Sequence, residues 1–334
     1  SRPRDLLSVA VGIGVLLLLA GWALAPVIST EIPAAQAMVW IPEWTWLAAL
    51  LPLTAVWGWM LSSVRSRRAR RCWMGIALVP SLVVGWGVWQ REWSPNPFEH
   101  GGGGARILFL NAQDPPKEDA GTVLDAIQSC DPDLVVIVNP GWIGPVWRIR
   151  NSGLEEEASP IEPDRRSEWL IRWVSPVLVA SRCGDVSVRT LNWKDGIRVM
   201  RVKASEPVSD IVGLSDIVVV DLPSDPTVIR AEVLERLSIL LDQKQQDGDL
   251  RADLLLGDFN TTPRTGGMNA VWPGLEDLFP RAGSGWGATW PRDRPLMRID
   301  LALASEQVDA RSLWTFDPGW GGHRGVVIEI GGDR

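Results

Sequence analysis

The stretch that decides the fold is Leu254-Leu255-Leu256-Gly257-Asp258-Phe259-Asn260. An apolar run long enough for one buried strand stops at a glycine, and an Asp and an Asn follow two residues apart. Because residues i and i+2 of an extended chain point to the same side, we expect Asp258 and Asn260 to project together from the strand's end. A carboxylate that orients water, beside an amide that donates to an oxyanion, is suited to attack on phosphorus. A turn capped by Asp and Asn is the other interpretation of this pattern.

Composition sets the broad class of the protein. The chain has 334 residues, of which 46% are hydrophobic, so it can hold one large domain and an additional segment. A formal charge of −7 and a pI near 5.1 argue against binding of nucleic acid through a basic surface. Ten of the 20 Trp residues lie before residue 94, and there is no Tyr. Cys130 and Cys183 could pair in an oxidising compartment, but free thiols are the simpler interpretation.

Three apolar segments, at about 6–28, 44–64 and 72–90, predict transmembrane helices. Each has roughly the 17–25 residues that cross a bilayer, and none carries an interior charge. Buried core helices of a soluble protein are the alternative. A cleaved signal peptide is a further alternative for the first segment, because Arg2 and Arg4 precede it and an Ala-x-Ala-like site follows. We expect the first segment to be retained.

The distribution of arginine predicts the orientation of these segments. Five arginines lie in the loop at 65–71, between the second and third segments, and should stay cytoplasmic. The connection between the first and second segments contains Glu31 and Glu43 but no Lys or Arg. The sequence therefore predicts a protein of the cell inner membrane whose C-terminal domain lies on the periplasmic, extracytoplasmic side.

The chain divides into a membrane anchor at 1–93, a Gly- and Pro-rich linker at 94–104 and a soluble domain at 105–334. The domain has many short apolar runs and few helical patterns, which favours an α+β fold of two packed sheets flanked by helices. The predicted strands cover 106–110, 134–138, 177–180, 186–188, 197–202, 217–220, 254–256, 299–303 and 325–330, and the predicted helices cover 120–129 and 226–245.

Polar residues recur where the predicted strands stop: Asn111, Asn139, Asp221, Asp258 and Asn260; Asp300 lies within its run instead. In this respect the domain resembles the endonuclease/exonuclease/phosphatase superfamily, the deoxyribonuclease-I-like fold, over roughly 105–330. The resemblance implies a four-layer α/β/β/α sandwich of two mixed sheets. Seven elements carry it in the expected order: Arg106–Asn111, Pro132–Val136, Val179–Arg182, Val218–Pro223, Gly257–Asn260, Ala288–Pro291 together with Arg298–Asp300, and Gly321–Val327.

For active relatives the resemblance implies one or two Mg²⁺ ions held by carboxylates, with water attacking a phosphoryl group. Asp258 would position or deprotonate the water, and Asn260 would hydrogen-bond the phosphoryl oxygen. Asp300 would orient His323, whose other interpretation is a structural ring in a Gly-rich turn. The resulting candidates are Asp258, Asn260, Asp300 and His323 for catalysis, Asn111 and Asp221 for substrate binding, and Asn111, Asn139 and Asp258 as weak metal ligands.

Three positions depart from the family's pattern. Asn139 stands where the resemblance implies a metal-binding Glu, and its amide brings no negative charge to a cation that normally needs a carboxylate. Asp221 stands where a phosphate-contacting His is implied and would repel an anionic substrate. Gly322 replaces the Asp implied just before His323. We therefore expect no cofactor or a weakly bound Mg²⁺.

The sequence is compatible with two functions. The favoured one is a membrane-anchored binding or structural subunit of a membrane-associated assembly, whose partners are the lipid bilayer and other membrane proteins. The alternative is an active Mg²⁺-dependent phosphodiesterase or phosphatase, the only case with a phosphoester substrate. Nucleic acid is not an expected partner. A transporter is not expected either, because the apolar segments hold no ionisable residue to mark a pathway.

Overall fold

The structure is a computed structural model. It describes residues 2–32, 35–61, 67–94, 96, 104–152, 169–182, 184–206, 209 and 214–331. Most of the predicted linker, part of the loop at 65–71 and Cys183 lie outside the described residues, whereas Cys130 is a free thiol.

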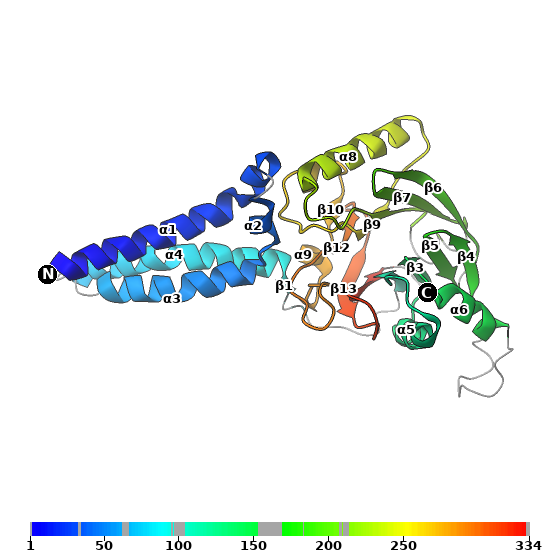
Figure 1. Ribbon diagram of the computed structural model, residues 1–334, viewed down its shortest axis with the longest axis horizontal. Helices are drawn as coiled ribbons and strands as arrows, with labels where there is room; N and C mark the ends of the chain where they lie inside the picture. The colour runs from blue at the N-terminus through cyan, green and yellow to red at the C-terminus, as the bar shows by residue number, and fades with distance from the viewer. Residues whose placement is uncertain are drawn as a thin grey trace.

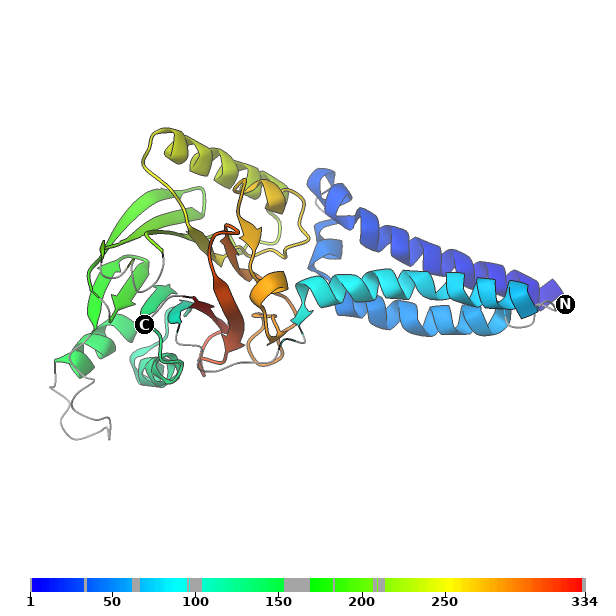
Figure 2. The same ribbon diagram turned by 180° about the vertical axis from the view of Figure 1, so that it is seen from behind.

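Three long helices form the N-terminal part and lie side by side, with the remaining domain at one end (Figures 1 and 2). Side chains of all three meet in a small apolar cluster that includes Val15, Leu50 and Val84. The hydroxyls of Thr54 and Ser81 lie 3.0 Å apart between the second and third long helices. The elements are α1 (Arg2–Glu31), the short α2 (Gln36–Trp40), α3 (Glu43–Leu61) and α4 (Arg67–Arg91).

Two stretches of the described residues are helical, long and apolar enough to cross a membrane: Leu6–Thr30 and Glu43–Leu61. Only 11% and 28% of their most apolar windows are buried, whereas a core helix of a soluble protein would be mostly buried. The structure thus supports two of the three predicted spans by length and composition. The third, at 72–90, lies within α4 and remains a prediction.

The C-terminal part contains two six-stranded mixed sheets. Only β2 with β3 and β8 with β9 pair in parallel among the described strand pairs. The first sheet has the order β13 (Ala310–Phe316), β14 (Gly325–Ile330), β2 (Ala105–Asn111), β3 (Leu134–Val138), β5 (Val177–Ser181) and β4 (Leu170–Val174). The second has the order β10 (Glu276–Asp277), β12 (Asp300–Ala304), β9 (Leu254–Asp258), β8 (Asp216–Asp221), β7 (Ile197–Ala204) and β6 (Val186–Lys194).

Burial explains why the sheets stack. Strands such as β2 are apolar on both faces: Ile107 and Phe109 face the other sheet, while Leu108 and Leu110 face helices. The helices packed on the first sheet are α5 (Lys117–Ser129) and α6 (Ile143–Asn151), and α8 (Arg230–Gln246) packs on the second. The short remaining elements are β1 (Trp93–Ser94), η3 (Met268–Ala270), α9 (Phe279–Ala282) and β11 (Gly285–Trp286). The predicted α+β class with two packed mixed sheets is confirmed.

Several boundaries differ from the prediction. The strand predicted at 299–303 begins at Asp300 as β12, so the prediction that Asp300 lies inside this strand is wrong. The helix predicted to begin at 226 begins at Arg230. The sequence patterns did not reveal β4, β13 or α6. Strand β4 is largely exposed, and neither β4 nor β13 has a continuous apolar run.

Ion pairs join the long helices directly to the C-terminal domain. The Glu43 carboxylate, at the start of α3, lies 2.6 Å from the Arg91 guanidinium at the end of α4 and 3.1 Å from that of Arg264 in the domain. Its side chain is 1% exposed. The next residue after α4, Glu92, accepts hydrogen bonds from the backbone N–H groups of Glu43 (2.6 Å) and Trp44 (3.1 Å). The helix ends and the domain therefore share one buried polar joint.

This joint predicts a pH dependence of stability. Burial raises the pKa of Glu92 to about 7, against the opposing effect of the two backbone N–H donors. The protonated form is favoured in the folded chain, so this stability is present below about pH 4.5 and is lost as pH rises through 7. We expect the free energy of unfolding to fall by about 2 kcal/mol between pH 5 and pH 8 from this group. Denaturant titrations should show that loss in the wild type and much less in Glu92→Gln. The same loss in both would contradict the assignment, and Glu118→Gln at an exposed position of α5 is the control.

Candidate functional site

The polar strand ends meet at one edge of the stacked sheets. Asn111 ends β2, Asn139 follows β3, and Asp221 and Asp258 end the parallel pair β8 and β9. These four residues, with Asn260 and His323, line one cavity of about 710 Å³. Asp300 pairs with Asp258 across the antiparallel strands β12 and β9, which brings it to the same edge. All the residues predicted for the site are therefore close together.

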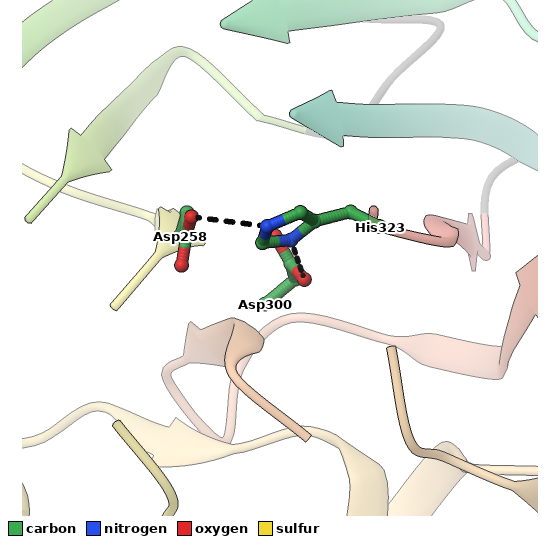
Figure 3. A group of neighbouring side chains, drawn as sticks. All are labelled: Asp258, Asp300 and His323. Atoms are coloured by element: carbon green, nitrogen blue, oxygen red, sulfur yellow. Dashed lines mark hydrogen bonds and ion pairs between the residues drawn. The ribbon is translucent and has the colours of Figure 1, made fainter. Parts of the chain in front are cut away.

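His323 lies between two carboxylates (Figure 3). Its Nδ1 is 2.8 Å from Oδ2 of Asp300, and its Nε2 is 3.8 Å from Oδ2 of Asp258. Burial lowers the pKa of His323, but Asp300 and then Asp258 outweigh it and raise that pKa to about 9. Burial, followed by the charge of Asp300, raises the pKa of Asp258 to about 8. The charges of Asp300 and Asp258 therefore favour the protonated form of the ring, which donates at both nitrogens.

The backbone after Asp258 turns instead of continuing as a strand. Asn260 has a φ of 48°, and its backbone N–H donates to Oδ1 of Asp258 at 2.8 Å. Its side-chain amide donates to the Leu222 carbonyl at 2.9 Å. The expectation that both side chains project together from an extended chain is wrong, and the capped turn is what the structure contains. Asn260 still borders the cavity, but with its amide N–H engaged by the backbone.

Arg198 is a site residue that the sequence did not reveal. Its Nη1 donates to Oδ2 of Asp221 at 2.8 Å and to Oδ1 of Asn139 at 3.1 Å. Burial raises the pKa of Asp221, and Arg198 opposes that rise. The pairing follows from strand register, because Arg198 of β7 lies opposite Asp221 of β8. The alternation of the strand at 197–202 was visible in the sequence, but its register with β8 was not.

Asn139 itself has a left-handed backbone, with a φ of 51°. Asn adopts that conformation more readily than Glu, because its short polar side chain can hydrogen-bond locally. Its amide donates to Oδ1 of Asn111 at 3.1 Å, and Asn111 in turn donates to Oδ2 of Asp258 at 2.8 Å. One chain of hydrogen bonds thus runs from Arg198 to Asp258.

One family sequence model and several solved structures are similar to this chain. Residues 59–321 match the sequence model described as the Endonuclease/Exonuclease/phosphatase family. A family protein from Bacteroides thetaiotaomicron has 12% sequence identity and a TM-score of 0.46, with 69% of this chain and 98% of that chain covered. One from Beutenbergia cavernae has 18% identity and a TM-score of 0.45, covering 68% of this chain and 71% of that chain. The comparison with curated proteins gave no match. On the family match over most of its length, this chain belongs to the endonuclease/exonuclease/phosphatase family.

Proposed function

We propose that this protein is a membrane-anchored member of its family that has kept the fold without metal-dependent hydrolysis and acts as a binding or structural subunit of a membrane-associated assembly. The observation that carries the proposal is the Arg198 guanidinium, which bridges Asn139 and Asp221 at the edge of the site. A fixed cation of the chain occupies the position next to the oxygens that a divalent cation would need. Its positive charge opposes binding of a second cation there.

The remaining donors do not fit a Mg²⁺ ion. Mg²⁺ takes oxygen ligands in a near-octahedral arrangement, usually with one or two carboxylates. Ligand atoms of Asp258, Asp300 and His323 lie within 4.8 Å of one another. However, Nδ1 of His323 is engaged by Asp300 at 2.8 Å, and the neighbouring carboxylates favour the protonated ring, a form that cannot ligate a metal. Asp258 accepts hydrogen bonds at both of its oxygens, from Asn111 and from the backbone of Asn260.

The same cluster favours the alternative function. A His between two carboxylates at the end of β9 is an arrangement that can stabilise charge on a phosphoryl group. Under that alternative the chain is a Mg²⁺-dependent phosphodiesterase or phosphatase.

Hydrolysis separates the two functions. We expect the purified full chain to hydrolyse bis(p-nitrophenyl) phosphate in Mg²⁺ or Mn²⁺ at a rate within about twofold of Asp258→Ala and His323→Ala. The physical reason is that the Arg198 guanidinium pairs with Asp221, and that Asn139 brings no charge where a carboxylate would hold the metal. Turnover that is well above background, and that disappears in both variants, would overturn the proposal in favour of the enzyme.

The membrane topology is a further part of the proposal. Three membrane helices, with α4 as the third, would place the arginines at 65–71 and the N-terminus on one side and the domain on the other. Figure 1 supports this arrangement, because the N-terminus and the domain lie at opposite ends of the helices. Alkaline phosphatase fused after Arg334 is expected to be active, since it folds only outside the cytoplasm. A second fusion at the same position carries a reporter that fluoresces only in the cytoplasm. If that reporter is fluorescent and the phosphatase fusion is inactive, the predicted orientation is wrong.

A further inference from the structure

We propose that the cavity binds the headgroup of a zwitterionic, amine-bearing membrane phospholipid, and that Trp40 of the anchor determines this specificity. The inference rests on the proposed function, because it assumes a membrane anchor and a site that binds without turnover.

The connector between the first two long helices forms part of the cavity wall. Trp40 ends α2 and lines the cavity together with residues of the sheets. Two hydrogen bonds fix α2 to the domain: the backbone N–H of Arg230 donates to Oε1 of Gln36 at 2.7 Å, and Oγ1 of Thr262 donates to the Val39 carbonyl at 2.9 Å. Gln36 and Val39 are buried in this contact. Trp40 is therefore held in place by the domain and not only by the helices.

Trp40 also precedes residues 59–321, over which the chain matches its family. This wall of the cavity is an addition of the anchor and not a part of the shared fold.

Two buried donors at this wall lack hydrogen-bond acceptors. The Arg230 guanidinium lies over the Trp40 ring, 5.6 Å from its centre, and both side chains line the cavity. Within the described residues, Nε1 of Trp40 and Nε of Arg230 are buried and have no hydrogen-bond partner. Arg230 as a whole is 1% exposed. The Nη atoms of Arg230 already donate to the Pro223 and Asp225 carbonyls. Buried N–H groups are normally paired, and a ligand that brings acceptor oxygens to this wall, as a phosphate does, would pair the remaining two.

The charges around the cavity indicate a ligand with both signs of charge. Among the described lining residues, the basic side chains are Arg198, Arg230 and His323, and the acidic side chains are Asp114, Asp221 and Asp258. A purely anionic ligand would find partners only in the basic side chains, whereas a phosphate joined to an ammonium group finds partners for both of its charges. The aromatic face of Trp290, which also lines the cavity, is suited to an ammonium group, whereas the Trp40 ring already faces the Arg230 guanidinium.

The position of the cavity relative to the helices points to a membrane lipid. Glu43, three residues after Trp40, begins the second candidate membrane span. Trp residues next to a span lie at the level of the headgroups. Apolar side chains, including Leu222, Met297 and Ile299, line the cavity beside the charged ones. A lipid at the membrane surface has the matching combination of a charged head and an apolar body.

Native mass spectrometry of the full chain in detergent tests the inference. Phosphatidylethanolamine, phosphatidylglycerol and the free headgroup glycerophosphoethanolamine are titrated separately, and the fraction of protein with one bound ligand is measured. We expect phosphatidylethanolamine to bind at least fivefold more tightly than either of the others, and Trp40→Ala to weaken its binding at least fivefold. Trp59→Ala is the matched control, since Trp59 is 64% exposed and lies sixteen residues after Glu43, roughly 24 Å along α3.

Equal binding of phosphatidylethanolamine by wild type and Trp40→Ala would overturn the role of Trp40. Equal binding of phosphatidylglycerol would overturn the preference for a zwitterion, and equal binding of the free headgroup would overturn the membrane lipid as the source. If Trp40→Ala does not fold, Trp40→Phe replaces it with the same expected loss, because Phe packs similarly but lacks the N–H donor. If the chain fractionates with membranes and hydrolyses no phosphoester but shows no preference among the lipids, this inference is contradicted and the proposed function is not. Hydrolysis dependent on Asp258 would contradict the proposed function instead.

Discussion

Replacement of Glu43 by Gln is expected to destabilise the full chain by about 3–5 kcal/mol, because it leaves the buried guanidinium of Arg264, and the partly exposed one of Arg91, without their carboxylate. Arg264 is 7% exposed at its side chain and lies 3.1 Å from Glu43, and Arg91 lies 2.6 Å from it. Nε1 of Trp22 also donates to Glu43, at 3.2 Å. Gln has nearly the same shape but no charge, so the change removes the ion pairs with little effect on packing.

The free energy of unfolding should be measured by denaturant titration of the full chain in detergent. The matched control is Asp125→Asn, which breaks the Arg150–Asp125 pair, also 2.6 Å long but with 27% and 62% of the two side chains exposed. An exposed pair of this kind contributes about 0–1 kcal/mol. Similar losses in both variants would show that the joint at Glu43 does not stabilise the chain as argued.

The joint also changes how the two parts of the chain are understood. The sequence predicted an anchor and a domain separated by a linker at 94–104. In the structure, β1 directly after α4 pairs with β11 of the domain, and the Arg298 side chain donates to the Arg91 carbonyl at 3.0 Å. Neither contact has a signature in the sequence, since each joins residues about 200 positions apart. The division into three parts remains a prediction, but the anchor and the domain are in direct contact.

The parts of the site that could be predicted are those that depend on local pattern. Buried strands such as Leu134–Val138 and Leu254–Asp258 are marked by apolar runs, and a polar residue directly after a run marks a strand end. Such residues gather wherever strand ends share one edge of a sheet. Arg198 and Trp40 could not be found in this way, because Arg198 reaches the site through strand register and Trp40 through packing of the anchor.

The second large effect that we expect is a gain of metal binding. The triple variant Asn139→Glu, Asp221→His, Arg198→Gln should bind Mg²⁺ at least a hundredfold more tightly than the wild type, a change of about 2.7 kcal/mol. Glu supplies a carboxylate, and removal of Arg198 removes a cation that lies 2.8 Å from Oδ2 of Asp221. A unit charge at about 4 Å is worth roughly 4 kcal/mol near a protein surface, so the guanidinium opposes Mg²⁺ binding to the extent that Asp221 does not neutralise it.

The double variant Asn139→Glu, Asp221→His, which retains Arg198, is the informative control in a calorimetric Mg²⁺ titration. It should gain much less affinity than the triple variant, since the guanidinium remains and has lost its partner Asp221. Glu at position 139 must also adopt a φ near 51°, at a cost of about 1–2 kcal/mol, so Asn139→Asp in the same background gives a less strained version. If neither triple variant binds Mg²⁺ more tightly than the wild type, loss of charge at these positions is not what keeps the metal out. If the double variant binds Mg²⁺ as tightly as the triple variant, Arg198 does not prevent metal binding. Its contacts with Asn139 and Asp221 then no longer support the proposed function.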